Sequence, residues 1–241
     1  MKIYIGTAGW AIPRKFASRL PTRGRHLECY ANVLPAVEIN TTFYRSHRPE
    51  TYQRWATSVP ESFRFAVKAP RQITHFARLA NARKPLVELL AEAGNLGPKL
   101  GPILFQLPPN LKFDTLRAER FFRLFRKLYR GDAVCEPRHP GWFMPEADQV
   151  FRKYRIARVV ADPARVPEGS EPGGWQKLVY FRLHGSPQMY FSAYDAGFLD
   201  RLAYRIRSLA RSAHVWCIFD NTAAGAAIGN ALDLLGVLLP I

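Results

Sequence analysis

Short apolar segments recur along the chain, and each is followed by a turn and then by a stretch with helical spacing of its apolar residues. The predicted strands are IYIG (3–6), AVEIN (36–40), RFAVK (64–68), PILFQL (102–107), AVCEP (133–137), RVVAD (158–162), LVYFRLHG (178–185) and HVWCIFDN (214–221). Helical periodicity appears near residues 25–33, 50–58, 84–94, 115–129, 146–155, 198–211 and 225–236. Strands separated by such crossovers predict a parallel sheet with helices outside it.

The number of predicted strands is the number that closes a (β/α)8 barrel, whose typical length is about 250 residues. The chain has 241 residues, and no Gly-rich phosphate loop follows an early strand, which disfavours an open doubly wound sheet. Residues 163–177 are rich in Pro and Gly, so a loop is expected to replace most of the helix after strand six. We therefore predict an α/β protein in which residues 1–241 form a single TIM-type barrel domain.

Polar residues occupy the face that points into the barrel on seven of the predicted strands, from the second to the eighth. Side chains alternate along a strand, and the face toward the helices must be apolar. In AVEIN, Val37 and Ile39 suit the helix side, which leaves Glu38 and Asn40 inside. The same alternation places a further set inside: Lys68, Gln106, Glu136, Arg138, Asp162, Arg182 and His184, with Asp220 and Asn221 added from strand eight. All stand near the carboxyl ends of strands, where barrels carry their active sites.

Two interpretations of this polar set are open. One is an internal salt-bridge network that merely closes the barrel. The other is a functional site, which we favour because buried ionic networks are seldom stabilising relative to an apolar core. Polar residues at the ends of seven successive strands are hard to explain by stability alone.

The same stretches carry a family resemblance over nearly the whole chain. The motifs are GTAGW (6–10), VEINTTFYR (37–45), RFAVKAP with ITH (64–75), LGPILFQLPPNL (100–111), VCEPRHPGWF (134–143), YFRLHG (180–185) and FDNTAAGAAIGNAL (219–232). In these motifs the chain resembles the YecE-like family, also called domain of unknown function 72. The resemblance implies a TIM barrel and a characteristic pattern formed by Glu38, Lys68, His75, Gln106, Glu136, Arg138, Arg182 and His184. It implies no settled activity, and the cofactor stays unknown.

Several chemistries are compatible with this set, and Glu38, Lys68, Glu136 and His184 are the catalytic candidates. Glu38, Glu136 and Asp162 could hold a hard cation such as Mg²⁺, although nearby cations would compete for them and no dense His/Asp cluster is present, so we predict no metal. Lys68 could form a Schiff base if burial lowers its pKa; a salt bridge to Glu38 or Glu136 is the favoured alternative.

A third chemistry is the binding of phosphate. Arg138, Arg182 and Lys68 could receive phosphate oxygens, while the carboxylates and Gln106 accept from hydroxyls or base edges. Loop residues extend this ligand-binding set: Arg45, His75, His139, Tyr190 and Tyr194. Aromatic side chains mixed with cations around a groove are typical of surfaces that stack bases and hold a backbone.

Composition changes this picture in one respect. Lys and Arg total 35 against 19 acidic residues, a formal net charge of +16, which favours polyanionic partners. The three cysteines are scattered, as in a protein of the reducing cytosol, and no apolar run is long enough to cross a bilayer. We expect a cytoplasmic protein without membrane contact, whose partner is nucleic acid or a phosphorylated small molecule.

Two functional hypotheses follow. The first is binding of nucleic acid or a phosphorylated ligand at the carboxyl ends of the strands, with phosphodiester-directed activity as its enzymatic form. The second is a small-molecule enzyme that uses Glu38 and Glu136 for acid–base chemistry on a sugar or sugar phosphate.

Overall fold

Ten strands form one sheet in the computed structural model, which describes residues 2–21 and 23–239. They are β1 (Ile3–Ala8), β2 (Ala36–Ile39), β3 (Arg64–Lys68), β4 (Leu100–Gln106), β5 (Ala133–Glu136), β6 (Ala157–Arg158), β7 (Val160–Asp162), β8 (Gly173–Gly174), β9 (Leu178–Leu183) and β10 (His214–Phe219). Their order is β7-β9-β10-β1-β2-β3-β4-β5-β6-β8.

The sheet closes into a barrel through the segment that contains β6 and β7. β6 pairs in parallel with β5, and β7, which begins after a single intervening residue, pairs in parallel with β9. This segment is the predicted sixth strand, divided at Val159. β8 is a two-residue antiparallel addition against β6. The predicted TIM-type barrel is therefore confirmed, with its sixth strand in two parts.

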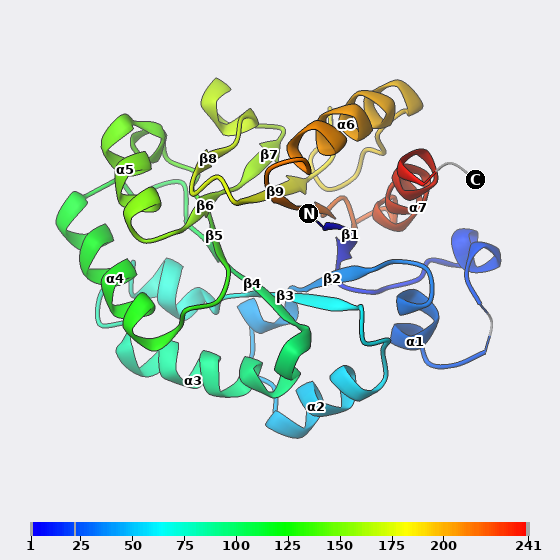
Figure 1. Cartoon of the computed structure of the whole chain (residues 1–241), viewed down its shortest axis with the longest axis horizontal. Helices are drawn as coiled ribbons and strands as arrows, with labels where there is room; N and C mark the ends of the chain where they lie inside the picture. The colour runs from blue at the N-terminus through cyan, green and yellow to red at the C-terminus, as the bar shows by residue number, and fades with distance from the viewer. Residues whose placement is uncertain (1, 22, 240–241) are drawn as a thin grey trace.

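The helices lie outside the ring of strands (Figure 1). They are α1 (His26–Ala31), α2 (Pro49–Thr57), α3 (Arg83–Ala93), α4 (Thr115–Leu128), α5 (Pro145–Lys153), α6 (Ala196–Leu209) and α7 (Ala227–Leu238). Between β7 and β9 the chain forms only a short helical turn, Pro167–Ser170, and β8, so the Pro/Gly-rich stretch does replace a helix. None of the helices formed by residues 2–21 and 23–239 has the length and apolar character to span a bilayer.

Two separate apolar clusters follow from the alternation of side chains along the strands. The larger one packs the outer strand faces, such as Val37, Ile39 and Phe105, against the helices. The smaller one fills the barrel interior with Ala36, Ala66, Leu104, Val134, Ala157, Val159, Leu178, Tyr180, Trp216 and Ile218. The inner cluster is the floor beneath the polar residues, which extend from the next inward positions of the same strands.

Trp216 sets the shape of this interior floor. Its ring stacks on Tyr180 with 5.9 Å between centroids and contacts Tyr4 at 4.7 Å. Gly101 on β4 leaves room for the indole, because a Cβ there would stand 2.6 Å from its ring atoms. The interior below the polar layer is thus filled by side chains, as in other small barrels.

Candidate functional site

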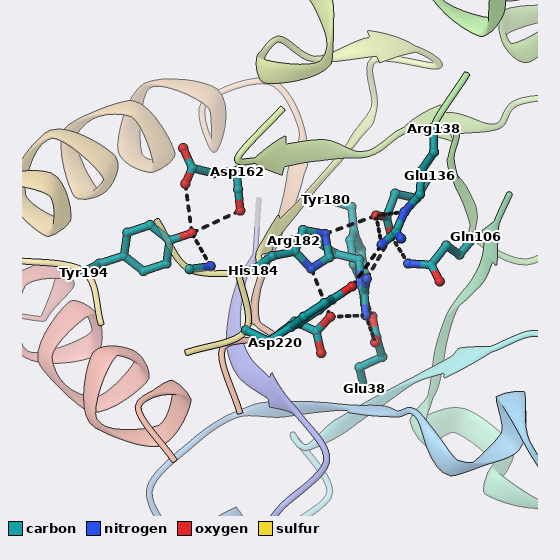
Figure 2. Close-up of polar contacts among 12 residues, drawn as sticks. Glu38, Gln106, Glu136, Arg138, Asp162, Tyr180, Arg182, His184, Tyr194 and Asp220 are labelled. Atoms are coloured by element: carbon teal, nitrogen blue, oxygen red, sulfur yellow. Dashed lines mark hydrogen bonds and ion pairs between the residues drawn. The ribbon is translucent and has the colours of Figure 1, made fainter. Parts of the chain in front are cut away.

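Arg182 lies at the centre of the polar layer and is completely buried. Its Nε donates to Glu38 Oε2 at 3.0 Å, and its Nη2 donates to Glu38 Oε1 at 2.7 Å, a bidentate pair. Nη1 donates to Glu136 Oε2 at 2.8 Å, and Nη2 lies 3.1 Å from Asp220 Oδ2. One guanidinium therefore joins three carboxylates (Figure 2).

The barrel brings these groups together because each stands at or near the carboxyl end of a parallel strand. Glu38 belongs to β2, Glu136 ends β5, and Asp220 directly follows β10. Neighbouring registers align further members: Gln106 at the end of β4 is opposite Glu136 and donates to its Oε2 at 2.9 Å. We call Glu38, Gln106, Glu136, Tyr180, Arg182, His184 and Asp220 the interior network.

His184 bridges two carboxylates of the interior network. Its Nδ1 lies 3.0 Å from Asp220 Oδ2, and its Nε2 lies 3.1 Å from Glu136 Oε1. Burial by itself would lower the pKa of the imidazole, but Glu136 and Asp220 raise it above its ordinary value. The imidazolium, which donates from both nitrogens, is the form that satisfies this geometry.

Tyr180 is a network member that the sequence interpretation missed. Its hydroxyl donates to Glu38 Oε2 at 2.8 Å, and its side chain is completely buried. Glu38 therefore receives three hydrogen bonds, two of them from Arg182. The sequence does indicate the inward position of Tyr180, because this residue precedes Arg182 by two positions on the same strand and so shares its inward face.

Glu136, Asp220 and Arg182 keep their charges at neutral pH. Burial opposes ionisation of Glu136, but Arg182, His184 and Arg138 together hold its pKa well below its ordinary value. The pKa of Asp220 is likewise lowered, since Arg182 and His184 outweigh the effect of burial. The carboxylates raise the pKa of Arg182 well above its ordinary value, although burial by itself would lower it.

Lys68, the last residue of β3, is placed differently from the carboxylates. It is 5% exposed, and its Nζ lies 4.2 Å from the centroid of the Phe43 ring. Within the described part of the chain its Nζ forms no ion pair or hydrogen bond. The salt bridge to Glu38 or Glu136 that we favoured from the sequence is therefore wrong, because Arg182 binds both carboxylates. Burial and Arg182 lower the pKa of Lys68 to about 8, against the opposite effect of the carboxylates.

Lys68 and two arginines of the loops that follow β3 and β5 lie close to the ring of His75. We call Lys68, Arg71 and Arg138 the cation cluster. Burial lowers the pKa of His75, and Lys68, Arg138 and Arg71 lower it further, which places their charges close to its ring. Arg138 donates to Glu136 Oε1 at 3.2 Å and to the Tyr190 hydroxyl at 3.4 Å. Glu136 is the carboxylate that Arg138 shares with Arg182.

Asp162 does not belong to the interior network, contrary to the prediction. Ala157 and Val159 are the inward residues of this strand, so Asp162 shares the outer face with Val160. There its Oδ1 accepts from the Tyr194 hydroxyl at 2.8 Å (Figure 2). Tyr194 also accepts from the Gly185 amide, so this pair fixes the loop after β9. The predicted parity was read one position out of register.

The remaining predicted residues lie around the network without joining it. Asn221 donates to Ser192 O and to Asn230 Oδ1 within the loops, and Asn40 Oδ1 is buried without a hydrogen bond. His139 accepts from the Gly141 amide and caps a helical turn. Tyr190 packs its ring against His184, with 5.7 Å between centroids. Arg45 is exposed on a groove outside the barrel.

Empty space is distributed unevenly near the site. Beside Glu136, Arg138 and His184 it amounts to about 20 Å³, little more than one water molecule requires. A larger groove of about 350 Å³ lies outside the barrel, lined by Phe43, Arg45, Arg71 and Phe76 and by the carboxylates of α3. Phe43 lines this groove, and its ring also contacts the Lys68 amine. The groove does not include the interior network.

The arrangement does not form the metal site considered from the sequence. Asp162 faces away from Glu38 and Glu136, and both glutamates are bound by Arg182. Across residues 2–21 and 23–239, no group of three or more His, Cys, Asp or Glu side chains is arranged to hold a metal ion. What the site does offer is the buried amine of Lys68 and the nearby guanidinium groups of Arg71 and Arg138, beside carboxylates that Arg182 already binds.

Comparison with known proteins identifies the family. Residues 4–239 match the family described as protein of unknown function DUF72. The UPF0759 protein YunF of Bacillus subtilis is 26% identical over 98% of this chain and 94% of its own length. The UPF0759 protein YecE of Escherichia coli is 35% identical over 44% of this chain and 38% of its own length. The chain belongs to the DUF72 family.

Solved structures show the same fold. A DUF72 family protein from Thermotoga maritima superposes with a TM-score of 0.82 at 22% identity, covering 99% of both chains. A D-psicose 3-epimerase with D-tagatose, from Clostridium cellulolyticum, gives a TM-score of 0.53 at 10% identity, covering 96% of this chain and 89% of that one. At these identities the likeness concerns the fold alone.

Proposed function

We propose that this DUF72 protein binds a phosphate-bearing ligand at the mouth of its barrel, through the cation cluster. The observation that carries the proposal is that Lys68 is buried without an ion pair, although three carboxylates lie in the same layer. Arg182, His184 and Arg138 together balance the charge of those three carboxylates, so among the described residues the charge of Lys68 has no anionic partner left. An anion at the mouth would supply the missing charge.

The chemistry of the cluster suits a phosphoryl group. Arg138 and Arg71 provide guanidinium donors, which bind phosphate oxygens with directed hydrogen bonds, and Lys68 adds a point charge. Arg71 lies over the rings of Phe76 and Tyr44, at 5.2 and 5.8 Å from their centroids, and both rings are exposed. These rings offer a stacking surface to a nucleobase attached to the phosphate.

Acid–base chemistry through Glu38 and Glu136 receives less support. A general acid at neutral pH needs a raised pKa, and that of Glu136 is lowered. Both oxygens of Glu38 accept hydrogen bonds, and the side chain is completely buried. These two carboxylates are better suited to holding Arg182 than to exchanging protons with a substrate.

Isothermal titration calorimetry with inorganic phosphate, ribose 5-phosphate, ribose and a single-stranded oligonucleotide tests the proposal. We expect the phosphorylated compounds to bind and ribose not to bind. Arg138→Gln should weaken phosphate binding about tenfold or more, because a hydrogen bond to a charged group contributes about 1.5–3 kcal/mol. Lys127→Met, in the last turn of α4 near the opposite end of the barrel, is the matched control and should have no effect.

Comparison of the titrated ligands distinguishes a small phosphorylated molecule from a nucleic acid as the source of the phosphate. Binding of ribose 5-phosphate in preference to the oligonucleotide would indicate a small-molecule site. Oligonucleotide binding that weakens steeply with salt and depends on Arg138 would indicate nucleic acid. If no phosphate compound binds, or if binding is insensitive to Arg138→Gln, the proposal is wrong.

A further inference from the structure

We propose that the Lys68 amine forms an imine with the carbonyl group of a small phosphorylated aldehyde or ketone at the mouth of the barrel. The phosphate part of this substrate class rests on the function proposed above. The imine part rests on the surroundings of Lys68 and is tested separately. Lys68 would then be a catalytic residue that bonds covalently to its substrate.

The two buried lysines of the chain show why Lys68 is unusual. Lys99 is also 5% exposed, but its Nζ donates to Ala56 O at 2.7 Å and to Val59 O at 2.8 Å and lies 3.1 Å from Glu61 Oε1. These acceptors occupy the hydrogen-bonding capacity of the Lys99 amine. The Nζ of Lys68 meets the face of Phe43 and, among the described residues, no such acceptor. Its lone pair is therefore available when the proton leaves.

The charges around Lys68 favour loss of that proton. Burial is the largest cause of its lowered pKa, and Arg182 on β9 adds to it. Glu38 on β2, Glu136 on β5 and Asp220 after β10 act in the opposite direction, but the pKa is still about 8. At pH 7 the free amine is then about 300 times more abundant than at an ordinary lysine of pKa about 10.5.

His75 is placed to carry the proton. Its ring packs perpendicular to Phe43 at 5.0 Å between centroids, and the Lys68 amine lies over the same Phe43 ring. Burial, Lys68, Arg138 and Arg71 all lower the pKa of His75, so its imidazole is neutral at pH 7 and can accept a proton. Within residues 2–21 and 23–239, no carboxylate opposes this effect at His75.

The reaction balances with these groups alone. The Lys68 ammonium gives one proton to His75, and the free lone pair attacks the carbonyl carbon while the C=O π electrons move to oxygen. The second nitrogen proton passes to that oxygen, which gives a neutral carbinolamine. His75 returns its proton to the hydroxyl, the nitrogen lone pair expels water, and an iminium ion remains. The products are the iminium and one water molecule.

The phosphate of the substrate would lie against Arg71 and Arg138. Both flank the mouth on the same side as His75, and both lower the pKa of its ring. With the phosphate bound by these arginines, the Lys68 amine is left to react with the carbonyl end of the substrate.

Reductive trapping in the intact wild-type protein tests the inference. The protein is incubated at pH 7 with glycolaldehyde phosphate and cyanoborohydride, which reduces an iminium to a stable secondary amine, and the labelled peptides are quantified by mass spectrometry. We expect Lys68 to be labelled at least tenfold faster than exposed Lys84, and Lys99 to remain unlabelled. Labelling of Lys68 should rise with pH through about 8.

Two controls separate the two parts of the proposal. Competition by inorganic phosphate, together with slower labelling by unphosphorylated glycolaldehyde, supports the phosphorylated substrate. Equal labelling by glycolaldehyde without competition keeps the imine and overturns the phosphate part. Labelling of Lys68 no faster than that of Lys84 overturns the imine, even where calorimetry shows that phosphate binds. Because this comparison uses only the wild-type chain, it does not depend on a variant that folds.

Discussion

Removal of the Arg182 guanidinium is the most direct test of the interior network. Arg182→Met keeps an unbranched side chain in the barrel but leaves Glu38, Glu136 and Asp220 without their shared cation. Removing one partner of a buried ion pair typically costs about 3–5 kcal/mol, because an uncompensated charge remains. Three carboxylates are affected here, so we expect the upper part of this range.

Urea denaturation followed by circular dichroism measures this change in the free energy of unfolding. For a chain of this size each kcal/mol corresponds to about 2–4 °C, so the melting temperature should fall by about 10–20 °C. Arg19→Met is the matched control. Arg19 forms one ion pair, with Asp233 at 2.8 Å, in which both side chains are largely exposed, and such a pair contributes at most about 1 kcal/mol.

The difference in stability between the wild type and Arg182→Met should depend on pH. In the wild type, the lowered pKa values of Glu136 and Asp220 contribute stability that is present above their unfolded values of about 4 and lost as the pH falls. Without Arg182, burial should raise these pKa values instead. Acidification should then protonate the buried carboxylates of the variant and increase its free energy of unfolding. The difference in stability between wild type and variant should shrink from pH 7 to pH 4.

A loss below about 1 kcal/mol, equal to that of Arg19→Met, would refute the reasoning, since it would mean that the three carboxylates are not desolvated in the folded protein. A difference that stays constant between pH 7 and pH 4 would contradict the assigned charges. Either result would also weaken the proposed function. Lys68 lacks an ion pair because Arg182 already binds Glu38 and Glu136.

Two further predictions concern neighbours of Arg182. Tyr180→Phe removes one hydrogen bond to buried Glu38 and should lower the free energy of unfolding in urea by about 1.5–3 kcal/mol; an unchanged value would mean that Arg182 alone satisfies Glu38. The pKa of His184 is raised in the folded state, so its contribution to stability is fully present below the unfolded value of about 6.5 and is lost as the pH rises through the folded pKa. His184→Gln should therefore reduce the fall in stability above pH 6.5 measured by urea titration at several pH values, and a fall as steep as that of the wild type would argue against a charged His184.

Much of the barrel was predictable because its pattern is local. Apolar outward residues such as Val37 and Phe105 and inward Glu38 and Gln106 follow from alternation along single strands, and the structure confirms those faces. The loop at 163–177 follows from Pro and Gly content. Alternation also brings Glu38, Glu136, Arg182 and His184 to one edge, because the carboxyl ends of parallel strands share it.

Alternation failed where a strand is short and divided. In the sixth strand, two-residue β6 and three-residue β7 pair with different neighbours, and apolar residues on both faces give no clear inward side. Asp162 was consequently assigned to the wrong face. Tyr180 was overlooked for a related reason: an aromatic residue on an inward face is typical of a core, and only its contact with Glu38 reveals a polar role.

The sequence by itself determined most of the residues that reach the mouth of the barrel, with Asp162 and Tyr180 as the exceptions, since strand order and alternation depend on short stretches of chain. Only the tertiary structure decided which charges pair there. One guanidinium from β9 reaches carboxylates from β2, β5 and β10, and this choice depends on distances across the barrel that no local pattern contains. Lys68 is left without a partner as a result, and its amine is the group on which the proposed chemistry depends.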